Sequence, residues 1–147
     1  EERDVHCLLY QGRYNLFNRE PEEEGILRQA KENGTGFIAF SPLAQGLLTN
    51  RYLNGIPDDS RIAKGGFLKK EALTDEVLKK IKALNELAIR RGQTLAEMAL
   101  AWVLKDNMVT SVIIGASSVG QLTDNLKAID NTTFSAEELE SIYQIVK

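Results

Sequence analysis

The sequence is poor in the residues from which many protein sites are built. Its 147 residues include one cysteine, Cys7, and one histidine, His6. This excludes an internal disulfide and a zinc site that takes several Cys or His side chains from one chain. A Ser-His-Asp or Cys-His site would have to use His6; we interpret His6 as a structural or surface residue. Cys7 lies in the apolar run VHCLLY, which predicts a small buried residue rather than a nucleophile.

Long apolar runs and a strong charge of one sign are also missing. No apolar stretch approaches the roughly 18 residues that span a bilayer, so we expect no membrane partner. The net charge of −3 gives no reason to expect nucleic acid. With 43% hydrophobic and 27% charged residues, the composition is that of a soluble globular protein, and the single cysteine favours a reducing cytoplasm. The chain begins EERDVHC, without methionine or signal-peptide pattern, and we expect an internal cut there.

The sequence does contain short apolar runs that alternate with helical patterns. Residues 5–10, 36–41 and 109–114 are runs of the kind found in strands buried on both faces of a parallel sheet. Between the first two, residues 22–33 predict a helix that stops at Gly34. The sequence therefore predicts an α/β protein.

Further helices are predicted from their caps. Residues 74–91 have apolar side chains at helical spacing, with Thr74 as the cap and Gly92 as the stop. Trp102, in the helix that follows, is predicted to lie in the core. Three helices begin with a Ser or Thr placed three residues before Glu or Gln, the pattern of a capping box: Thr94 with Glu97, Ser118 with Gln121, and Ser135 with Glu138.

No repeat or proline-rich linker divides the chain, and we interpret residues 1–147 as a single unit. Three parallel strands cannot close a barrel, and as an open sheet they leave two apolar edges, so part of the fold is missing or a partner supplies it. Residues 50–70 form a loop of unusual length. Its basic side chains are either a solvated surface or a clamp for a phosphate: Arg51, Arg61, Lys64, Lys69 and Lys70.

The expected site lies at the carboxyl ends of the strands, as in other parallel α/β proteins. Gly115 ends the third strand, where backbone can approach a ligand, and the helix that follows has free N–H groups for an anion. The segment GASSVGQL is neither a Walker A loop nor a G-x-G-x-x-G motif, because Gln121 and Ser117 occupy the deciding positions. An ordinary capped helix is the alternative. Phe40 is either core or a platform for a ring.

Four motifs in a fixed order carry a family resemblance: YQGRYNLFNR, GFIAFSPLAQGLLTNRY, GIPDDSR and SVIIGASSVGQLTDNLKAI. They resemble the C-terminal half of an aldo-keto reductase, in the branch of potassium channel β subunits and bacterial L-glyceraldehyde 3-phosphate reductases. The resemblance implies strands 6 to 8 of a parallel (β/α)₈ barrel, incomplete as given. It also implies NADP(H) as cofactor and an aldehyde or ketone as substrate.

The resemblance further implies the cofactor contacts. Gln11 would hold the nicotinamide carboxamide, and Phe40 would stack on the nicotinamide ring. Asp124 and Asn125 would hold the adenine amino group, although Asp replaces the more usual Glu and shortens the reach. The pyrophosphate would be wrapped by Ser41, Pro42, Leu43, Ala44 and Gly46. Arg51 and Arg61 would close over the pyrophosphate and the 2′-phosphate, with Ser117 and Gln121 near the latter. Gly115 is a further candidate for cofactor contact.

No catalytic residue is assigned. In the family, the catalytic Asp, Tyr, Lys and His lie in the N-terminal half, and no tyrosine here matches that motif. Three hypotheses follow: the NADPH-binding part of a carbonyl reductase, a cofactor-sensing regulatory subunit, or an inactive half-barrel that covers its open edges by self-association.

Overall fold

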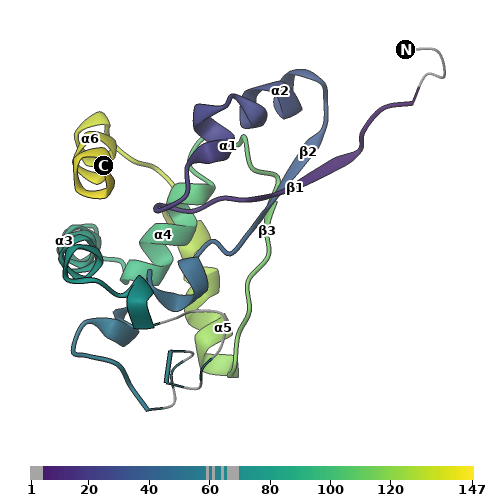
Figure 1. Cartoon of the computed structure of the whole chain (residues 1–147). Helices are drawn as coiled ribbons and strands as arrows, with labels where there is room; N and C mark the ends of the chain where they lie inside the picture. Colours follow the sequence, from purple (N-terminus) through teal and green to yellow (C-terminus); the bar gives the residue numbers. More distant parts are fainter. Residues whose placement is uncertain (1–4, 59, 61, 64, 66–69) are drawn as a thin grey trace.

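The computed structural model describes residues 5–58, 60, 62–63, 65 and 70–147 (Figure 1). Its strands are β1 (Leu9–Arg13), β2 (Gly36–Phe40) and β3 (Ser111–Val112). Its α-helices are α1 (Glu20–Glu23), α2 (Ile26–Glu32), α3 (Asp75–Arg90), α4 (Leu95–Val103), α5 (Val119–Leu126) and α6 (Ala136–Val146), and short 3₁₀ helices lie between them. In the part of the chain so described, no helix has the length and apolar character needed to cross a membrane.

The three strands form one parallel sheet in the order β1-β2-β3. The α/β class with a parallel sheet is therefore confirmed. The third strand is shorter than the predicted 109–114. Its pairing with β2 continues on either side through backbone bonds from Thr110 N to Phe37 O and from Ile113 N to Ala39 O, both 2.8 Å.

The first strand is displaced from its predicted position. It begins at Leu9 rather than at residue 5, because Leu9 pairs with Gly36, where β2 starts. The described residues before Leu9 extend away from the other elements (Figure 1). Cys7 is consequently exposed, and the prediction of a buried thiol was wrong. An apolar run predicts a strand, but the neighbouring strand determines which of its residues pair.

The helix predicted over 22–33 is two short helices. Gly25 lies between α1 and α2 with φ of +75°, a left-handed conformation that glycine adopts readily and that interrupts a right-handed helix. The predicted stop at Gly34 is confirmed by its φ of +67°. The prediction missed the break because the acidic residues before Gly25 resemble the first turn of one longer helix.

The predicted caps are largely confirmed. Thr74 accepts a hydrogen bond from Val77 N at the start of α3. Complete capping boxes join Thr94 to Glu97 and Ser135 to Glu138. At α5 only half of the box forms: Ser118 caps the helix, but the side chain of Gln121 bonds to Ser117 instead.

The core is built around α4, which contacts α3 and α5, while α3 also contacts α6. In Figure 1, α3, α4 and α6 lie on one side of the strands. Trp102 is buried, as predicted. Two groups of large apolar side chains remain exposed, one along β1 and its approach and one along β3, α5 and the 3₁₀ helix after it. They are Val5, Leu8, Leu9 and Tyr10, and Ile113, Val119, Leu122, Leu126 and Ile129.

Candidate functional site

A cleft of about 610 Å³ lies where the chain leaves β2 and β3. Both walls come from segments that follow strands, as expected for a parallel sheet. The residues after β2 supply one wall and those between β3 and α5 supply the other. They are Ser41, Pro42, Leu43, Gln45, Gly46, Thr49, Arg51 and Tyr52, then Ile113, Ile114, Gly115, Ala116, Ser117 and Gln121.

The wall after β2 begins with a tight turn at residues 41–46, which we call the 41–46 turn. Ser41, Ala44 and Gln45 have φ of 51°, 47° and 59°, and Gly46 follows with 99°. Left-handed conformations in residues other than glycine cost on the order of 1–3 kcal/mol each and cluster at binding sites. Bonds from Ala44 N to Ser41 O and from Gly46 N to Leu43 O close the turn.

The end of this wall is fixed by Thr49. Its hydroxyl donates to Gly46 O at 2.7 Å and accepts from Arg51 N at 3.2 Å. Thr49 thereby connects the 41–46 turn to the 3₁₀ helix Asn50–Tyr52, whose first turn carries Arg51. The Arg51 side chain lines the cleft.

The opposite wall ends at the N-terminus of α5. The Ser117 amide and hydroxyl both donate to Gln121 Oε1, at 2.8 and 2.9 Å. Ser118 Oγ accepts from Gln121 N at 3.1 Å. The positive end of the α5 dipole and the Arg51 guanidinium make this region suited to an anion. Among the described residues that line the cleft, none is acidic.

Most of the residues predicted to contact the phosphates lie together in this cleft. Eight of them line it: Ser41, Pro42, Leu43, Gly46, Arg51, Gly115, Ser117 and Gln121. Ala44 is buried within the 41–46 turn. Gln11 is exposed on the edge strand β1, opposite Ile38, and Phe40 ends β2; neither lines the cleft. Arg61 lies outside the described residues.

The two residues predicted to hold adenine differ in their surroundings. Asn125 lies one turn after Gln121 on α5, so both are on one face of the helix. It is 5% exposed, and its Nδ2 has no hydrogen-bond partner in the described part of the chain. Asp124 is exposed and forms an ion pair with Lys127 at 2.8 Å. This hydrogen bond raises the pKa of Lys127.

Sequence reasoning missed Gln45, Thr49, Tyr52 and Asn15. The first three line the cleft. The buried Asn15 donates from Nδ2 to Ser41 O at 2.9 Å. Thr49 has a local signal, because Thr before a short helix is a common cap. Asn15 and Gln45 have none, since their positions depend on contacts or backbone angles that no short motif encodes.

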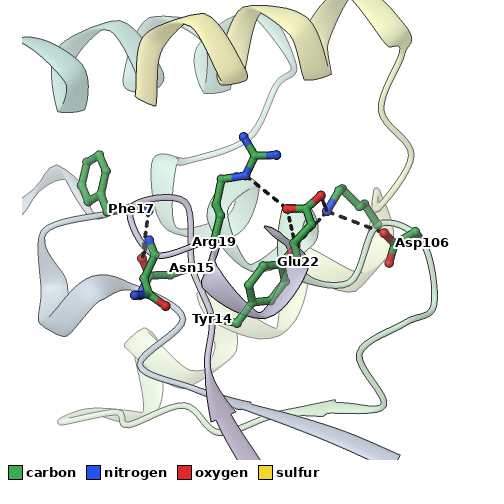
Figure 2. Close-up of polar contacts among 8 residues, drawn as sticks. Tyr14, Asn15, Phe17, Arg19, Glu22 and Asp106 are labelled. Atoms are coloured by element: carbon green, nitrogen blue, oxygen red, sulfur yellow. Dashed lines mark hydrogen bonds and ion pairs between the residues drawn. The ribbon is translucent and has the colours of Figure 1, made fainter. Parts of the chain in front are cut away.

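A second polar cluster lies beside β1 and contains a tyrosine, a lysine and carboxylates (Figure 2). Tyr14 Oη donates to Glu22 Oε2 at 3.2 Å, and Lys105 Nζ donates to Tyr14 Oη at 3.0 Å. Arg19 and Asp106 complete the ion pairs, with Arg19 Nε 3.1 Å from Glu22 Oε2. Tyrosine and lysine are residue types that the family resemblance implies among the catalytic groups.

The surroundings of this cluster indicate a structural role. Burial, together with the charges of Glu22 and Asp106, raises the pKa of Tyr14, so its phenol is a poor proton donor. Burial likewise lowers the pKa of Lys105 despite the carboxylates nearby. Neither side chain lines the cleft. The cluster joins the end of β1 to α1 and to the residues after α4.

Comparison with known proteins shows the family of this chain. The model of the aldo/keto reductase family matches residues 1–147, and the chain belongs to that family. It is 50% identical over 144 residues to the L-glyceraldehyde 3-phosphate reductase of Escherichia coli K12, covering 95% of this chain and 42% of that protein. It is 40% identical over 129 residues to a probable voltage-gated potassium channel subunit beta of Arabidopsis thaliana, covering 86% of this chain and 39% of that one.

Solved structures are likewise similar to nearly the whole of this chain, which covers less than half of theirs. The chain superimposes on the glycerol dehydrogenase of Gluconobacter oxydans with a TM-score of 0.75 and 26% identity, covering 94% of this chain and 42% of that one. For an aldo-keto reductase of Bacillus halodurans in its holo form the TM-score is 0.66 at 26% identity, with coverage of 99% and 44%. The chain thus spans about two-fifths of the length of these relatives. The predicted family and branch are confirmed.

Proposed function

We propose that this chain is the NADP(H)-binding part of an aldo-keto reductase that reduces aldehydes or ketones. The observation that carries the proposal is the cleft at the carboxyl ends of β2 and β3. There, a left-handed turn, an arginine and a helix N-terminus converge without an acidic side chain among the described lining residues. This combination suits a pyrophosphate.

The residues present fit the cofactor. The 41–46 turn and Ser117 would hold the phosphates, and Arg51 would close over them. The unpartnered Nδ2 of Asn125 would donate to an acceptor on the adenine ring, which gives this buried donor the partner it lacks. Gln11 and Phe40 would contact the nicotinamide. When bound, NADPH supplies hydride to the carbonyl carbon of the substrate.

The proposal extends to the organisation of the chain, its location and the rest of the barrel. Residues 1–147 would be one unit, with 50–70 as a clamp in which Arg61 meets the 2′-phosphate. The location would be cytoplasmic. The chain would supply strands 6 to 8 of a (β/α)₈ barrel, and the exposed apolar groups at its two sheet edges would be covered by the rest of that barrel. The catalytic groups would come from that missing part, and we assign none here.

The test is a titration of the chain with NADPH and NADH, followed by fluorescence transfer from protein to nicotinamide. The same titration is repeated after adding, in trans, the part of the E. coli relative that this chain does not cover. We expect NADPH to bind the completed assembly more tightly than NADH. An assembly that forms and binds neither nucleotide would refute the proposal.

A matched pair of variants tests the residues. Ser41→Ala removes a hydroxyl from the cleft, whereas Ser135→Ala removes a hydroxyl that accepts from Glu138 N at the start of α6 and does not line it. We expect only Ser41→Ala to weaken NADPH. Equal effects of the two would show that the cleft is not where the cofactor binds.

A second candidate is a cofactor-sensing regulatory subunit, which the similarity to the plant channel subunit favours. A third is a half-barrel that self-associates through its exposed edges. Turnover of an aldehyde by the completed assembly supports the enzyme. NADPH binding without turnover supports the regulatory role, and a concentration-dependent oligomer that binds no nucleotide supports the third.

A further inference from the structure

We propose that Asn15 is a positioning residue that sets the conformation of Ser41 at the entrance of the 41–46 turn and thereby the affinity of the cleft for the cofactor. The inference rests on the proposed function. It concerns a side chain that lies outside the cleft and that the family resemblance did not assign.

Asn15 is anchored firmly. It is 0% exposed and lies two residues after β1. Its Oδ1 accepts from Phe17 N and from Asn18 N, both at 2.9 Å, and backbone bonds join Asn15 and Asn18 in both directions. With its acceptor fully used, the amide is oriented so that Nδ2 points to Ser41 O, 2.9 Å away.

Ser41 is the residue that needs such an anchor. Its φ of 51° is unfavourable for serine, and a conformation of this kind persists only where neighbouring groups hold it. Its carbonyl accepts from Ala44 N within the turn and from Asn15 Nδ2 outside it. The second bond crosses from the end of β1 to the end of β2, so it fixes the turn relative to the sheet.

Only an amide can make both sets of bonds. Aspartate has the same shape and would keep accepting from Phe17 N and Asn18 N, but it has no N–H for Ser41 O and would place two oxygens against each other. Asn15→Asp therefore removes the link to Ser41 while leaving the local turn its acceptor. Asn15→Ser also removes the link to Ser41 and keeps the local acceptor, without introducing a buried charge. A serine hydroxyl can accept from the following amides, but the side chain is shorter.

The experiment measures NADPH affinity and the conformation of Ser41 in the protein completed as above. The three-bond coupling between the amide and α protons of Ser41 depends on φ and is read by NMR without any ligand. We expect Asn15→Asp to change this coupling and to weaken NADPH about tenfold, the effect of one lost hydrogen bond. Asn18→Ser, beside it, should change neither.

The outcomes separate the two claims. Wild-type protein that does not bind NADPH refutes the proposed function, and the Ser41 coupling then decides on Asn15 alone. If the wild type binds and the Asn15 variants keep both the affinity and the coupling, the positioning role is wrong. Should Asn15→Asp fail to fold, Asn15→Ser carries the test. A variant that loses thermal stability but keeps the coupling and the affinity also refutes it, because the role would then be structural.

Discussion

Polar groups are paired differently at the cleft and among the helices around Arg91, which we call the helical side. On the helical side, Arg91 is 3% exposed and its guanidinium is fully engaged. It pairs with Glu138 at 2.7 Å, donates to Thr133 O and Gln93 Oε1, and lies 3.7 Å from the centre of the Phe134 ring. By contrast, the 41–46 turn that lines the cleft holds unfavourable backbone angles, and Asn125, one turn after the cleft residue Gln121 on α5, has a buried N–H without a partner.

This difference indicates where the sequence serves stability and where it serves binding. Groups satisfied within the fold stabilise it directly. Groups left strained or unpaired lower the free energy of unfolding, and at the cleft we expect a ligand to complete them. The comparison can be tested by asking whether substitutions on the two sides move different quantities.

The largest effect is expected for Arg91→Met. It removes the ion pair with Glu138 and the bonds to Thr133 and Gln93 from a buried position, which should lower the free energy of unfolding by about 3 kcal/mol. The measurement is urea denaturation. Arg90→Met, at the exposed neighbour on the same helix, should change little. If both substitutions lower the free energy of unfolding equally, the contacts of the Arg91 guanidinium do not stabilise the fold.

The next effect is expected for Asn125→Ala. Because its Nδ2 is buried without a partner, removing it should leave stability unchanged or higher, while the NADPH dissociation constant rises about tenfold. Gln93→Ala is the matched control on the helical side, since that buried amide is satisfied by Asn131 O and Arg91 Nε. It should lose stability and keep its affinity. If Asn125→Ala lowered stability and kept its NADPH affinity, or Gln93→Ala kept its stability and lost affinity, the contrast between the two regions would be wrong.

A smaller effect is expected for Gln45→Gly. Glycine adopts a φ near +59° without strain, so this substitution should raise the free energy of unfolding by about 1 kcal/mol. Gln144→Gly, in the regular part of α6, should lower it by a similar amount. Thermal unfolding measures both. A loss of stability in Gln45→Gly would mean that the turn is not strained.

The smallest effect is expected on the free energy of unfolding at low pH. Partial burial raises the pKa of Glu138, but hydrogen bonds from Ser135 and Arg91 outweigh burial and lower it below its ordinary value of 4.5. A carboxyl group with a lowered folded-state pKa stabilises the protein above about pH 4.5 and loses this contribution as the pH falls further. Unfolding curves of the wild type should therefore converge with those of Glu138→Gln on acidification.

The control for this pH dependence is Glu137→Gln, in the same first turn but exposed. It removes the same charge from the same end of α6 and leaves the bonds that Glu138 receives from Ser135 and Arg91 in place. A constant difference between the wild type and Glu138→Gln down to pH 3 would contradict the lowered pKa. The effect is small because Glu138 is partly exposed and solvent screens it.

Local chemistry explains which parts of the fold were predictable. The caps at Thr74, Thr94 and Ser135 were found because each depends on bonds within four residues. The start of β1 was not, since the position of β2 decides it, and the exposure of Cys7 follows from the same cause. The break at Gly25 requires a backbone angle that the apolar spacing does not reveal.

The site residues were also predictable only where their positions depend on local sequence. Residues of contiguous motifs, such as Ser41 and Gly46 or Ser117 and Gln121, were predicted and lie together in the cleft. Asn15 escaped because its effect depends on a bond between residues 26 positions apart in the chain. The contacts of Gln11, Phe40 and Asp124 with a cofactor stay predictions.

The parallel sheet limits how copies of this chain can join. β1 and β3 form opposite edges of the sheet and run in the same direction. A two-fold dimer that pairs β1 with β1 would place those strands antiparallel, whereas pairing β1 of one copy with β3 of the next continues the parallel pattern. This second contact is head-to-tail, so it leads to a closed ring or to an unbounded filament. If copies of this chain joined through their sheet edges, they would therefore form rings or filaments, whereas a symmetric edge would stop at two copies.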